Sequence, residues 1–212
     1  MNHPTILDIV LLLVTGLTAV YMVWRFWARY GWEKKVYAIY YILGFAVLFV
    51  SGVLLIFMGY EILATPFVLT VASLIPFGIS VGIVRQYYGK YTKAYIWFAT
   101  IGLVAIALTS FGQMAGLKKI AVPLFHAVAG FIIFLGPFLV KKYGEGNPAK
   151  GFEWVGIGGM LIGIGGLALA SLSFGAPLFG IFTAELVFNI LSSILLLMAL
   201  AMAWGFMKDI KN

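Results

Sequence analysis

The last long apolar run of the sequence contains one acidic residue, Glu185, followed at helical spacing by Asn189, Ser192 and Ser193. Residues three or four positions apart lie on the same face of a helix, so these oxygen-bearing groups would form a polar stripe. An ionisable residue inside a membrane span suggests a function, because its burial costs free energy. The stripe could carry a proton or hold a cation, and it therefore predicts an ion, proton or small-solute conduit.

A surface position for Glu185 is the alternative interpretation. The run that contains it is about ten residues longer than a bilayer requires. When depth is counted back from Trp204, Glu185 falls near one surface, where it would pair with Lys118 or Lys119. When depth is counted forward from Pro177, it falls deeper, in the third helical turn. The depth of this carboxyl group therefore separates the two interpretations.

His126 is the only histidine within an apolar run and completes the candidate site with Glu185, Asn189, Ser192 and Ser193. One histidine cannot supply both axial ligands of a haem, and the chain contains no cysteine. We therefore expect no metal site and no cofactor. A hydrogen bond to a neighbouring helix is the commoner role for such a histidine, and a pH-sensitive pair with Glu185 is the alternative.

Enzymes that act within membranes need residues that this chain does not bring together. An intramembrane aspartyl protease needs two aspartates at membrane depth, but Asp8 and Asp209 lie near opposite ends of the chain. A serine enzyme needs a histidine that converges on the nucleophile, and Ser51 has no identified base. The residues therefore predict a protein without catalytic activity.

Composition predicts the elements that carry these residues. Of 212 residues, 63% are hydrophobic and 10% are charged, which excludes a water-soluble globular domain. Seven apolar runs can each cross a bilayer, and without the alternation of barrel strands they must do so as helices. The predicted fold is an all-α, polytopic seven-transmembrane-helix bundle with spans at Ile6–Phe26, Val36–Met58, Pro66–Val84, Ala94–Met114, Ile120–Val140, Phe152–Phe174 and Pro177–Phe206.

Three prolines suggest how the runs are grouped. Pro66, Pro123 and Pro177 each follow a short joint, and they lie 57 and 54 residues apart. A proline is tolerated in the first turn of a helix, where its missing N–H would have no partner. We therefore expect each to open a helix. Residues 1–212 would form a single transmembrane domain, with a first helix followed by hairpins of helices 2–3, 4–5 and 6–7.

Basic residues are distributed unevenly between the joints. Twelve of the fourteen lysines and arginines follow the first, third, fifth and seventh runs, whereas Lys118 and Lys119 lie on the other side. Cytoplasmic joints carry an excess of such residues, so the N-terminus is predicted outside and the C-terminus in the cytoplasm. All six tryptophans lie near the basic side, as expected of headgroup anchors. We expect a multi-pass protein of a prokaryotic plasma membrane.

The net charge of +7 bears on the partners. In a membrane protein it favours topology and anionic lipid over nucleic acid, which we do not expect as a partner. Basic and aromatic residues alternate along the cytoplasmic side, which could also dock a soluble protein. The predicted lipid-headgroup rim consists of Arg25, Arg29, Lys34, Lys35 and Arg85.

The sixth run is rich in glycine, with Gly159, Gly163 and Gly166 along one face. Small residues let helices approach closely in lipid, so we expect this face to pack within the bundle, with a homo-oligomer contact as the alternative. Gly163 and Gly165 also begin a dinucleotide-binding pattern that ends at Ala168, but no strand precedes it. A nucleotide cofactor is therefore excluded.

Two functions follow from these observations. The first is a non-catalytic accessory or sensory module that binds a lipid or small apolar ligand and acts through a partner at the basic rim. The alternative is the conduit that uses Glu185 and Asn189. The plan of seven helices resembles that of rhodopsins, but the last run contains no lysine that could hold a retinal. The scarcity of polar groups favours the module, because ion pathways need more polar lining.

Overall fold

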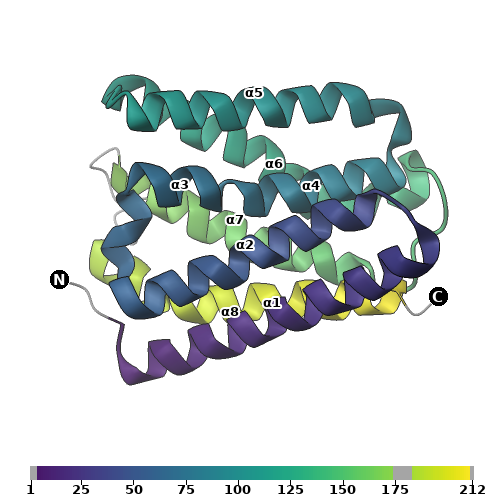
Figure 1. The fold of residues 1–212 in the computed structure, drawn as a ribbon, viewed down its shortest axis with the longest axis horizontal. Coiled ribbons are helices and arrows are strands. Elements are labelled where there is room, and N and C mark those ends of the chain that lie inside the picture. The colour runs from purple at the N-terminus through teal and green to yellow at the C-terminus, as the bar shows by residue number, and fades with distance from the viewer. Residues whose placement is uncertain (1–3, 174–182, 211–212) are drawn as a thin grey trace.

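The computed structural model describes residues 4–173 and 183–210, which form an all-helical bundle (Figure 1). Within these residues, six segments are long and apolar enough to cross a membrane, and Glu153–Ala168 is a shorter apolar segment. The helices are α1 (Ile6–Glu33), α2 (Tyr37–Met58), α3 (Pro66–Ala72), α4 (Leu74–Tyr87), α5 (Thr92–Phe111), α6 (Ala115–Tyr143), α7 (Glu153–Ser173) and α8 (Ala184–Ile210). Short 3-10 helices, η1 (Tyr60–Ala64) and η2 (Gly89–Tyr91), lie in two of the joints.

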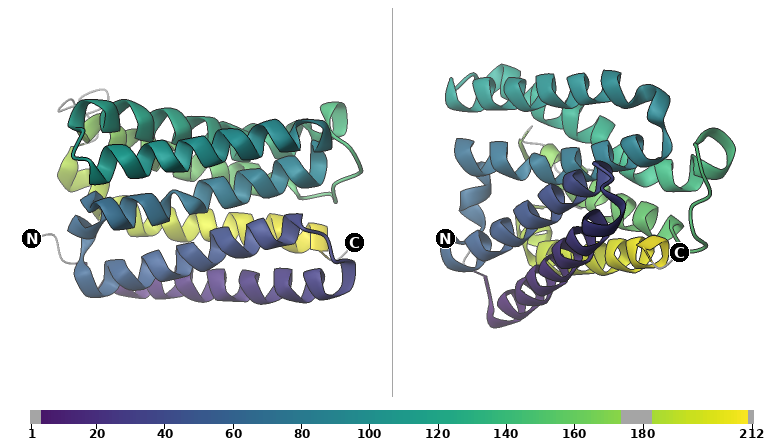
Figure 2. Two further views of the ribbon diagram at one scale, coloured as in Figure 1. Left: turned by 45° about the horizontal axis from the view of Figure 1, so that its top comes forward. Right: turned by 45° about the vertical axis from the view of Figure 1, so that its right-hand side comes forward.

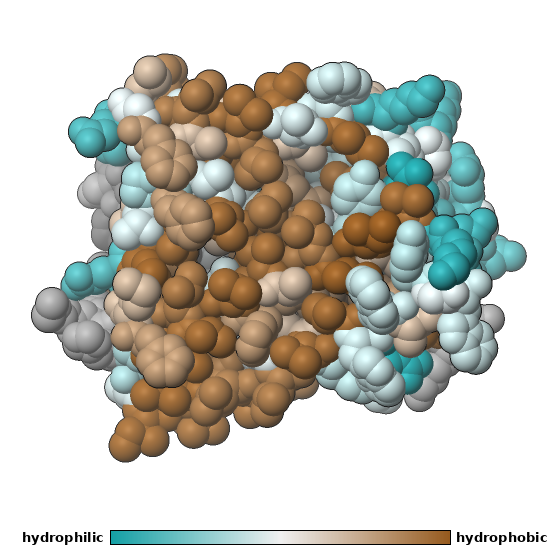
Figure 3. Space-filling view, viewed as in Figure 1, coloured by the Kyte–Doolittle hydropathy of each residue, from teal (hydrophilic) through white to brown (hydrophobic). Residues whose placement is uncertain are grey.

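The surface of the bundle is apolar along its middle. Large side chains such as Leu17, Phe57 and Leu108 face outward and are more than half exposed. Figure 3 shows an apolar band across the visible face, with polar residues gathered at its two margins. An exposed band of this extent would be unstable in water and matches the hydrocarbon of a bilayer. The chain is therefore a multi-pass helical membrane protein.

Six helices close into a ring. In order around it, α1 packs against α2, α2 against α4, α4 against α6, α6 against α7, α7 against α8, and α8 returns to α1. Helix α5 lies outside this ring and contacts α3, α4 and α6 (Figure 2). The first and last helices of the chain are therefore neighbours, and the ring depends on their contact.

The two ends of the bundle differ in charge. We call the end that holds the α1–α2, α4–α5 and α6–α7 joints and the last turn of α8 the basic end, on the right of Figure 1. The other end, which holds η1 and the α5–α6 joint, is called the opposite end. All six tryptophans lie on the basic-end halves of their helices, and each is at least 45% exposed. Their positions fit an interfacial belt.

The interior of the ring is filled by apolar and aromatic side chains. Near the basic end, the rings of Phe26, Tyr41 and Phe206 lie within 5.2 Å of one another between centroids, and all three side chains are fully buried. Ile83 and Ile133 belong to the same core and come from α4 and α6. Side chains from the ring helices therefore occupy the position that a central channel would need.

The prolines behave differently from one another. Pro66 is the first residue of α3, as expected of a proline that opens a helix. The expectation for Pro123 is wrong, because it lies inside α6, which begins at Ala115. Pro123 removes only one backbone donor, and a membrane helix tolerates this loss where neighbouring groups compensate. Pro177 lies outside the described residues.

One predicted span is interrupted. The segment Pro66–Tyr87 is divided at Ser73 into α3 and α4. Pro76 has no N–H to bond the Ala72 carbonyl, so one helical hydrogen bond is lost at this point. The Ser73 side chain donates to the Leu69 carbonyl at 2.8 Å. The break is therefore a local proline effect within a single membrane-spanning segment.

Close helix contacts of α7 are limited to its basic-end half. A Cβ atom added at Gly159 would lie 2.8 Å from the backbone nitrogen of Phe134, and one at Gly158 would lie 3.0 Å from the Met198 carbonyl oxygen. A Cβ atom at Gly163 or Gly166 would meet no atom within 4 Å. The expected packing role within the bundle is therefore corrected for these two glycines, because no helix of the described residues approaches them closely.

Candidate functional site

The structure places Glu185 and Asn189 on the surface of α8. Both side chains are exposed, and Glu185 lies in the first turn of the helix. Thr183 precedes this turn, and its side-chain oxygen accepts a hydrogen bond from the Leu186 N–H at 3.3 Å. A carboxylate in the first turn of a helix interacts favourably with the positive end of the helix dipole. This local effect is a sufficient structural reason for an acid at position 185.

His126 lies apart from Glu185. Its Nδ1 donates to the Val122 carbonyl at 2.9 Å, which assigns the ring proton to that nitrogen. Its ring lies 6.3 Å from the Phe77 ring on α4. Among the described residues, no hydrogen bond or ion pair joins His126 to Glu185. The predicted pH-sensitive pair therefore does not form within the described chain.

Ser192 has a partner that the sequence interpretation does not include. Its hydroxyl is fully buried and donates to Asp8 Oδ1 on α1 at 2.5 Å. The other carboxylate oxygen, Oδ2, accepts the Thr5 hydroxyl at 2.7 Å and the Thr5 N–H at 2.9 Å. Thr5 and Asp8 thus form a capping box at the start of α1. The neighbouring Ser193 is half-buried, and its side chain makes no hydrogen bond among the described residues.

Tyr60 of η1 lies beside this cluster at the opposite end. Its hydroxyl is buried without a hydrogen-bond partner among the described residues. Burial, together with the nearby charge of Asp8, raises the pKa of Tyr60 to about 12. The phenol therefore remains protonated and keeps its donor next to the carboxylate of Asp8. We call the group of Thr5, Asp8, Tyr60 and Ser192 the Asp8 cluster.

A second buried acid anchors the basic end. Asp209 of α8 is 7% exposed, and its Oδ1 accepts the Tyr87 hydroxyl at 2.6 Å. Its Oδ2 accepts Gln86 Nε2 at 2.9 Å and Arg29 Nη1 at 3.1 Å. One carboxylate therefore ties α8 to α1 and α4. Three side-chain donors and the Ala149 N–H, at 3.5 Å from Oδ1, satisfy this buried charge, as a charge in a low-dielectric interior requires.

The same network extends along α1 and α2. Arg29 Nε donates to Glu33 Oε1 at 2.7 Å, and the Tyr37 hydroxyl donates to Glu33 Oε2 at 2.5 Å. The Tyr41 hydroxyl donates to Gln86 Oε1 at 2.8 Å. We call this group of Arg29, Glu33, Tyr37, Tyr41, Gln86, Tyr87 and Asp209 the Asp209 network. The network joins four of the six ring helices, namely α1, α2, α4 and α8.

Arg29 therefore does not belong to the predicted lipid-headgroup rim. Its side chain is only 14% exposed and is directed to two carboxylates within the chain. The other rim residues remain accessible: Lys34 and Lys35 are exposed, and Arg25 and Arg85 are half-buried. Lys34 lies over the Tyr30 ring and Arg25 over the Trp24 ring. Its two carboxylate partners, Glu33 and Asp209, distinguish Arg29 from these neighbours.

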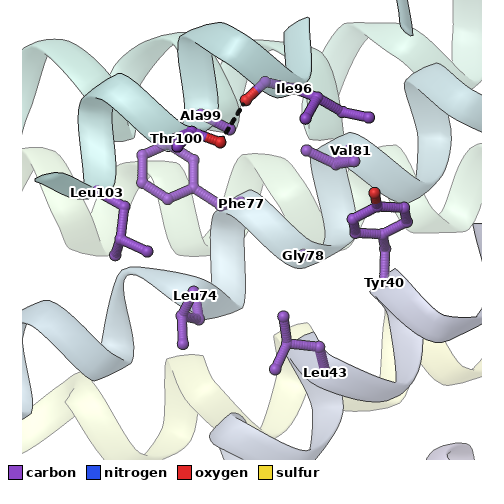
Figure 4. Close-up of a pocket in the computed structure, with 10 residues that line it drawn as sticks. All are labelled: Tyr40, Leu43, Leu74, Phe77, Gly78, Val81, Ile96, Ala99, Thr100 and Leu103. Carbon is purple, nitrogen blue, oxygen red and sulfur yellow. Dashed lines mark hydrogen bonds between the residues drawn. The ribbon is translucent and has the colours of Figure 1, made fainter. Parts of the chain in front are cut away.

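Two of the grooves on the surface of the described residues are candidate ligand sites. The smaller lies between α2, α4 and α5 and has a volume of about 110 Å³. Figure 4 shows its lining of apolar side chains, with the Thr100 hydroxyl turned back to the Ile96 carbonyl and away from any ligand. Ligand pockets usually measure about 300–1,000 Å³. This groove is therefore too small for a drug-sized ligand.

The larger groove lies between α7 and α8 and has a volume of about 470 Å³, within the usual range for ligands. Two tryptophans, Trp154 and Trp204, form its basic-end part, and apolar side chains continue it toward the middle of the bundle. We call it the α7–α8 groove. Its lining residues are Trp154, Ile157, Leu161, Leu197, Leu200, Ala201 and Trp204.

Some of these features have signals in the sequence. Thr5 and Asp8 match the spacing of a capping box, which marks both the start of α1 and a carboxylate held by its own turn. The contacts of Asp8 with Ser192 and of Arg29 with Asp209 join residues about 180 positions apart. Such pairs depend on how the ring closes and have no local signal.

Comparison with known proteins adds no functional assignment. The chain matches no protein-family model, no curated protein and no solved structure. Among the described residues, no three histidine, aspartate or glutamate side chains are placed to hold a metal ion. The proposal for function therefore depends on the α7–α8 groove and on the charge distribution of the bundle.

Proposed function

We propose that this chain is a non-catalytic membrane module, accessory or sensory, that binds a lipid or small apolar ligand in the α7–α8 groove. The single observation that carries the proposal is the groove itself, about 470 Å³ in volume and lined almost entirely by apolar side chains. Apolar grooves of this size suit ligands with hydrocarbon surface. The groove opens between helices that face lipid, so an apolar ligand can reach it from within the bilayer.

The proposal includes a topology. The chain crosses the membrane seven times, with α7 as a span in addition to the six long apolar segments, and the basic end faces the cytoplasm of a prokaryotic plasma membrane. The excess of lysine and arginine at this end supports that orientation. The exposed tryptophans on the same halves of the helices support an interface at their level.

The module would act through a protein partner at the basic end, or through a second copy of itself. Trp32 supports a docking role there because it is 91% exposed. Lys34 and Lys35 follow it and are also exposed. This combination of an aromatic side chain and free basic groups would suit an acidic soluble partner as well as lipid headgroups.

The geometry favours this module over the ion or proton conduit. Glu185 and Asn189 lie on the surface, and the Ser192 hydroxyl donates its hydrogen bond to Asp8. Aromatic side chains occupy the interior of the ring near the basic end. A pathway for ions needs polar or hydrated lining through the whole bilayer.

Lipid retention provides the test. The protein is purified in mild detergent, and the lipids that remain bound are counted by native mass spectrometry. Ala201→Leu adds bulk to the floor of the α7–α8 groove, and we expect it to remove a lipid that the original chain retains. Ala127→Leu makes the same change at an exposed position of α6 and should leave retention unchanged.

A second variant protects the test against misfolding. Leu197→Trp fills the groove from a position that is more than half exposed, so it does not disturb the core. Thermal unfolding of each variant reports whether the bundle is intact. Equal lipid retention in the original chain, Ala201→Leu and Leu197→Trp, all folded, would contradict the proposed function.

A further inference from the structure

We propose that the occupant of the α7–α8 groove is an anionic phospholipid, with its phosphate at Lys208 and an acyl chain between α7 and α8. This inference rests on the proposed function and names the chemical class of its ligand. It also moves the specific lipid contact from the predicted rim to the basic-end mouth of the α7–α8 groove. Three observations support it: the position of Lys208, the lack of a compensating acid, and the depth of the groove.

Lys208 lies at the basic-end mouth of the groove. Its Nζ is 4.5 Å from the centroid of the Trp204 ring, and that ring forms one wall of the groove. A Cβ atom added at Gly151 would lie 3.2 Å from Lys208 Cγ, so the lysine stem packs against the α6–α7 joint. The side chain is therefore held between an aromatic ring and the backbone, with its ammonium group exposed.

The charge of Lys208 is not neutralised within the described residues. The adjacent acid, Asp209, points inward and pairs with Arg29 at 3.1 Å. Glu153, at the start of α7, pairs with Lys141 at 3.3 Å and also accepts the Gly151 N–H. Both acids near the mouth are thus engaged by other groups. Within the described residues the mouth therefore presents a positive charge without an acidic partner, which complements a headgroup of net negative charge better than a zwitterionic one.

The groove has the depth that an acyl chain needs. From Trp154 to Leu161 the lining of α7 extends over a stretch of eight residues, about 10 Å along the helix axis. Leu197 and Leu200 line the facing part of α8. A lipid with its phosphate at Lys208 would therefore place about the first two thirds of its chain against protein, because one leaflet is half of a hydrocarbon core about 30 Å thick. The two tryptophans would lie near the level of the glycerol group.

A titration with two lipids tests this assignment. The full chain is delipidated in a neutral detergent and titrated with dioleoylphosphatidylglycerol or dioleoylphosphatidylcholine, and bound lipid is counted by native mass spectrometry. We expect Lys208→Gln to weaken phosphatidylglycerol binding about fivefold, the effect of one basic residue at a membrane surface. Phosphatidylcholine has the same phosphate, but its choline ammonium compensates that charge, so its binding should weaken less.

Lys90→Gln is the matched control. Lys90 is also an exposed lysine over an aromatic ring, Tyr91, at the basic end, but it lies outside the groove. We expect Lys90→Gln to bind phosphatidylglycerol as the original chain does. An equal loss of phosphatidylglycerol binding in both variants would mean that the overall positive charge of the surface, and not one lysine, attracts the lipid. This result would overturn the assignment to Lys208. Trp204→Ala should weaken both lipids, because it removes a wall of the groove.

The remaining outcomes separate this inference from the proposed function. If Ala201→Leu abolishes binding of both lipids and Lys208→Gln has no effect, the groove binds lipid without a headgroup contact, and only the anionic assignment fails. If Ala201→Leu changes neither, the groove does not bind lipid and both proposals fail. Dimers that Ala201→Leu disrupts would identify a second copy of the chain as the occupant and would overturn the inference.

Discussion

Arg29 of α1 donates a hydrogen bond through Nη1 to Asp209 Oδ2 of α8, at 3.1 Å, and so joins the first and last helices of the chain. At the other end of the same two helices, Ser192 of α8 donates to Asp8 of α1. Each pair buries an aspartate where the ring of six helices closes. Polar pairs between membrane helices are directional, whereas lipid gives little hydrophobic drive for association. These two contacts therefore determine how α1 and α8 are aligned.

Removal of the charge on Asp209 should destabilise the bundle. Asp209→Asn keeps the shape of the side chain but leaves Arg29 without one of its two carboxylates. We expect a loss of about 2 kcal/mol in the free energy of unfolding, less than for a fully buried pair because Glu33 still contacts Arg29. Equilibrium unfolding in mixed micelles measures this loss.

The comparison with two other variants isolates the ion pair. Lys141→Ala breaks the Lys141–Glu153 pair, whose lysine is 63% exposed, and should cost less than about 1 kcal/mol. The double variant Arg29→Met, Asp209→Asn removes the buried cation as well and should be more stable than Asp209→Asn alone. If the double variant is the less stable of the two, an unpaired Arg29 is not the source of the loss.

The Asp8 cluster makes a parallel prediction with a neighbouring control. Ser192→Ala removes a hydrogen bond to a buried carboxylate and should cost about 1.5 kcal/mol in the free energy of unfolding. Ser193→Ala changes the next residue, whose side chain makes no hydrogen bond among the described residues. Its free energy of unfolding should stay within about 0.5 kcal/mol of that of the original chain. Equal effects at both positions would show that the Asp8 contact contributes nothing specific.

These contacts mark the limit of what the amino-acid sequence predicts. Apolar run length predicts the spans to within a few residues at most ends, because the bilayer sets helix length directly. Pro66 follows the rule for a first turn. Pro123 does not, because a membrane helix can continue through a proline. A sequence rule cannot tell whether the neighbouring helices favour a helix that begins at the proline or one that continues through it.

The burial of side chains with long-range partners is harder to predict than the helix spans. Arg29 has the sequence surroundings of a rim residue, and only its rotation on α1 relative to α8 directs it inward. Glu185 and Asp209 are both acids of the last helix, but only Asp209 is buried, whereas Glu185 is exposed. The α7–α8 groove likewise arises from two separate helices and has no single motif. Depth and rotation, which decide these cases, are properties of the assembled ring.

The glycines of α7 should differ in their tolerance to substitution. In Gly159→Ala the added methyl group would lie 2.8 Å from the backbone nitrogen of Phe134, which cannot move without shifting α6. We expect a cost of about 2 kcal/mol, measured by unfolding in mixed micelles. Gly163→Ala meets open space and should be neutral or slightly stabilising, because alanine is the better helix former. Equal destabilisation of both would contradict the close contact at Gly159.

The proposed orientation can be tested with single cysteines, because the chain contains none of its own. Lys34→Cys lies between α1 and α2 at the basic end, and Lys119→Cys lies in α6 at the opposite end; both positions are exposed. A maleimide that cannot cross membranes should label Lys119→Cys in intact cells and Lys34→Cys only after permeabilisation. The reverse pattern would place the basic end outside.

Glu185 provides the sharpest distinction between the module and the conduit. Its exposed position in the first turn of α8 predicts that Glu185→Gln removes only a favourable interaction with the helix dipole, worth up to about 1 kcal/mol. In liposomes with an imposed pH gradient, we expect proton and cation flux of the variant to equal that of the original chain and of protein-free liposomes. Asn189→Ala, also exposed, should behave in the same way. Flux that requires the original chain and disappears in Glu185→Gln would instead mean that water and ions reach this carboxylate along a path through the bundle, and the conduit would replace the lipid-binding module as the better account of the fold.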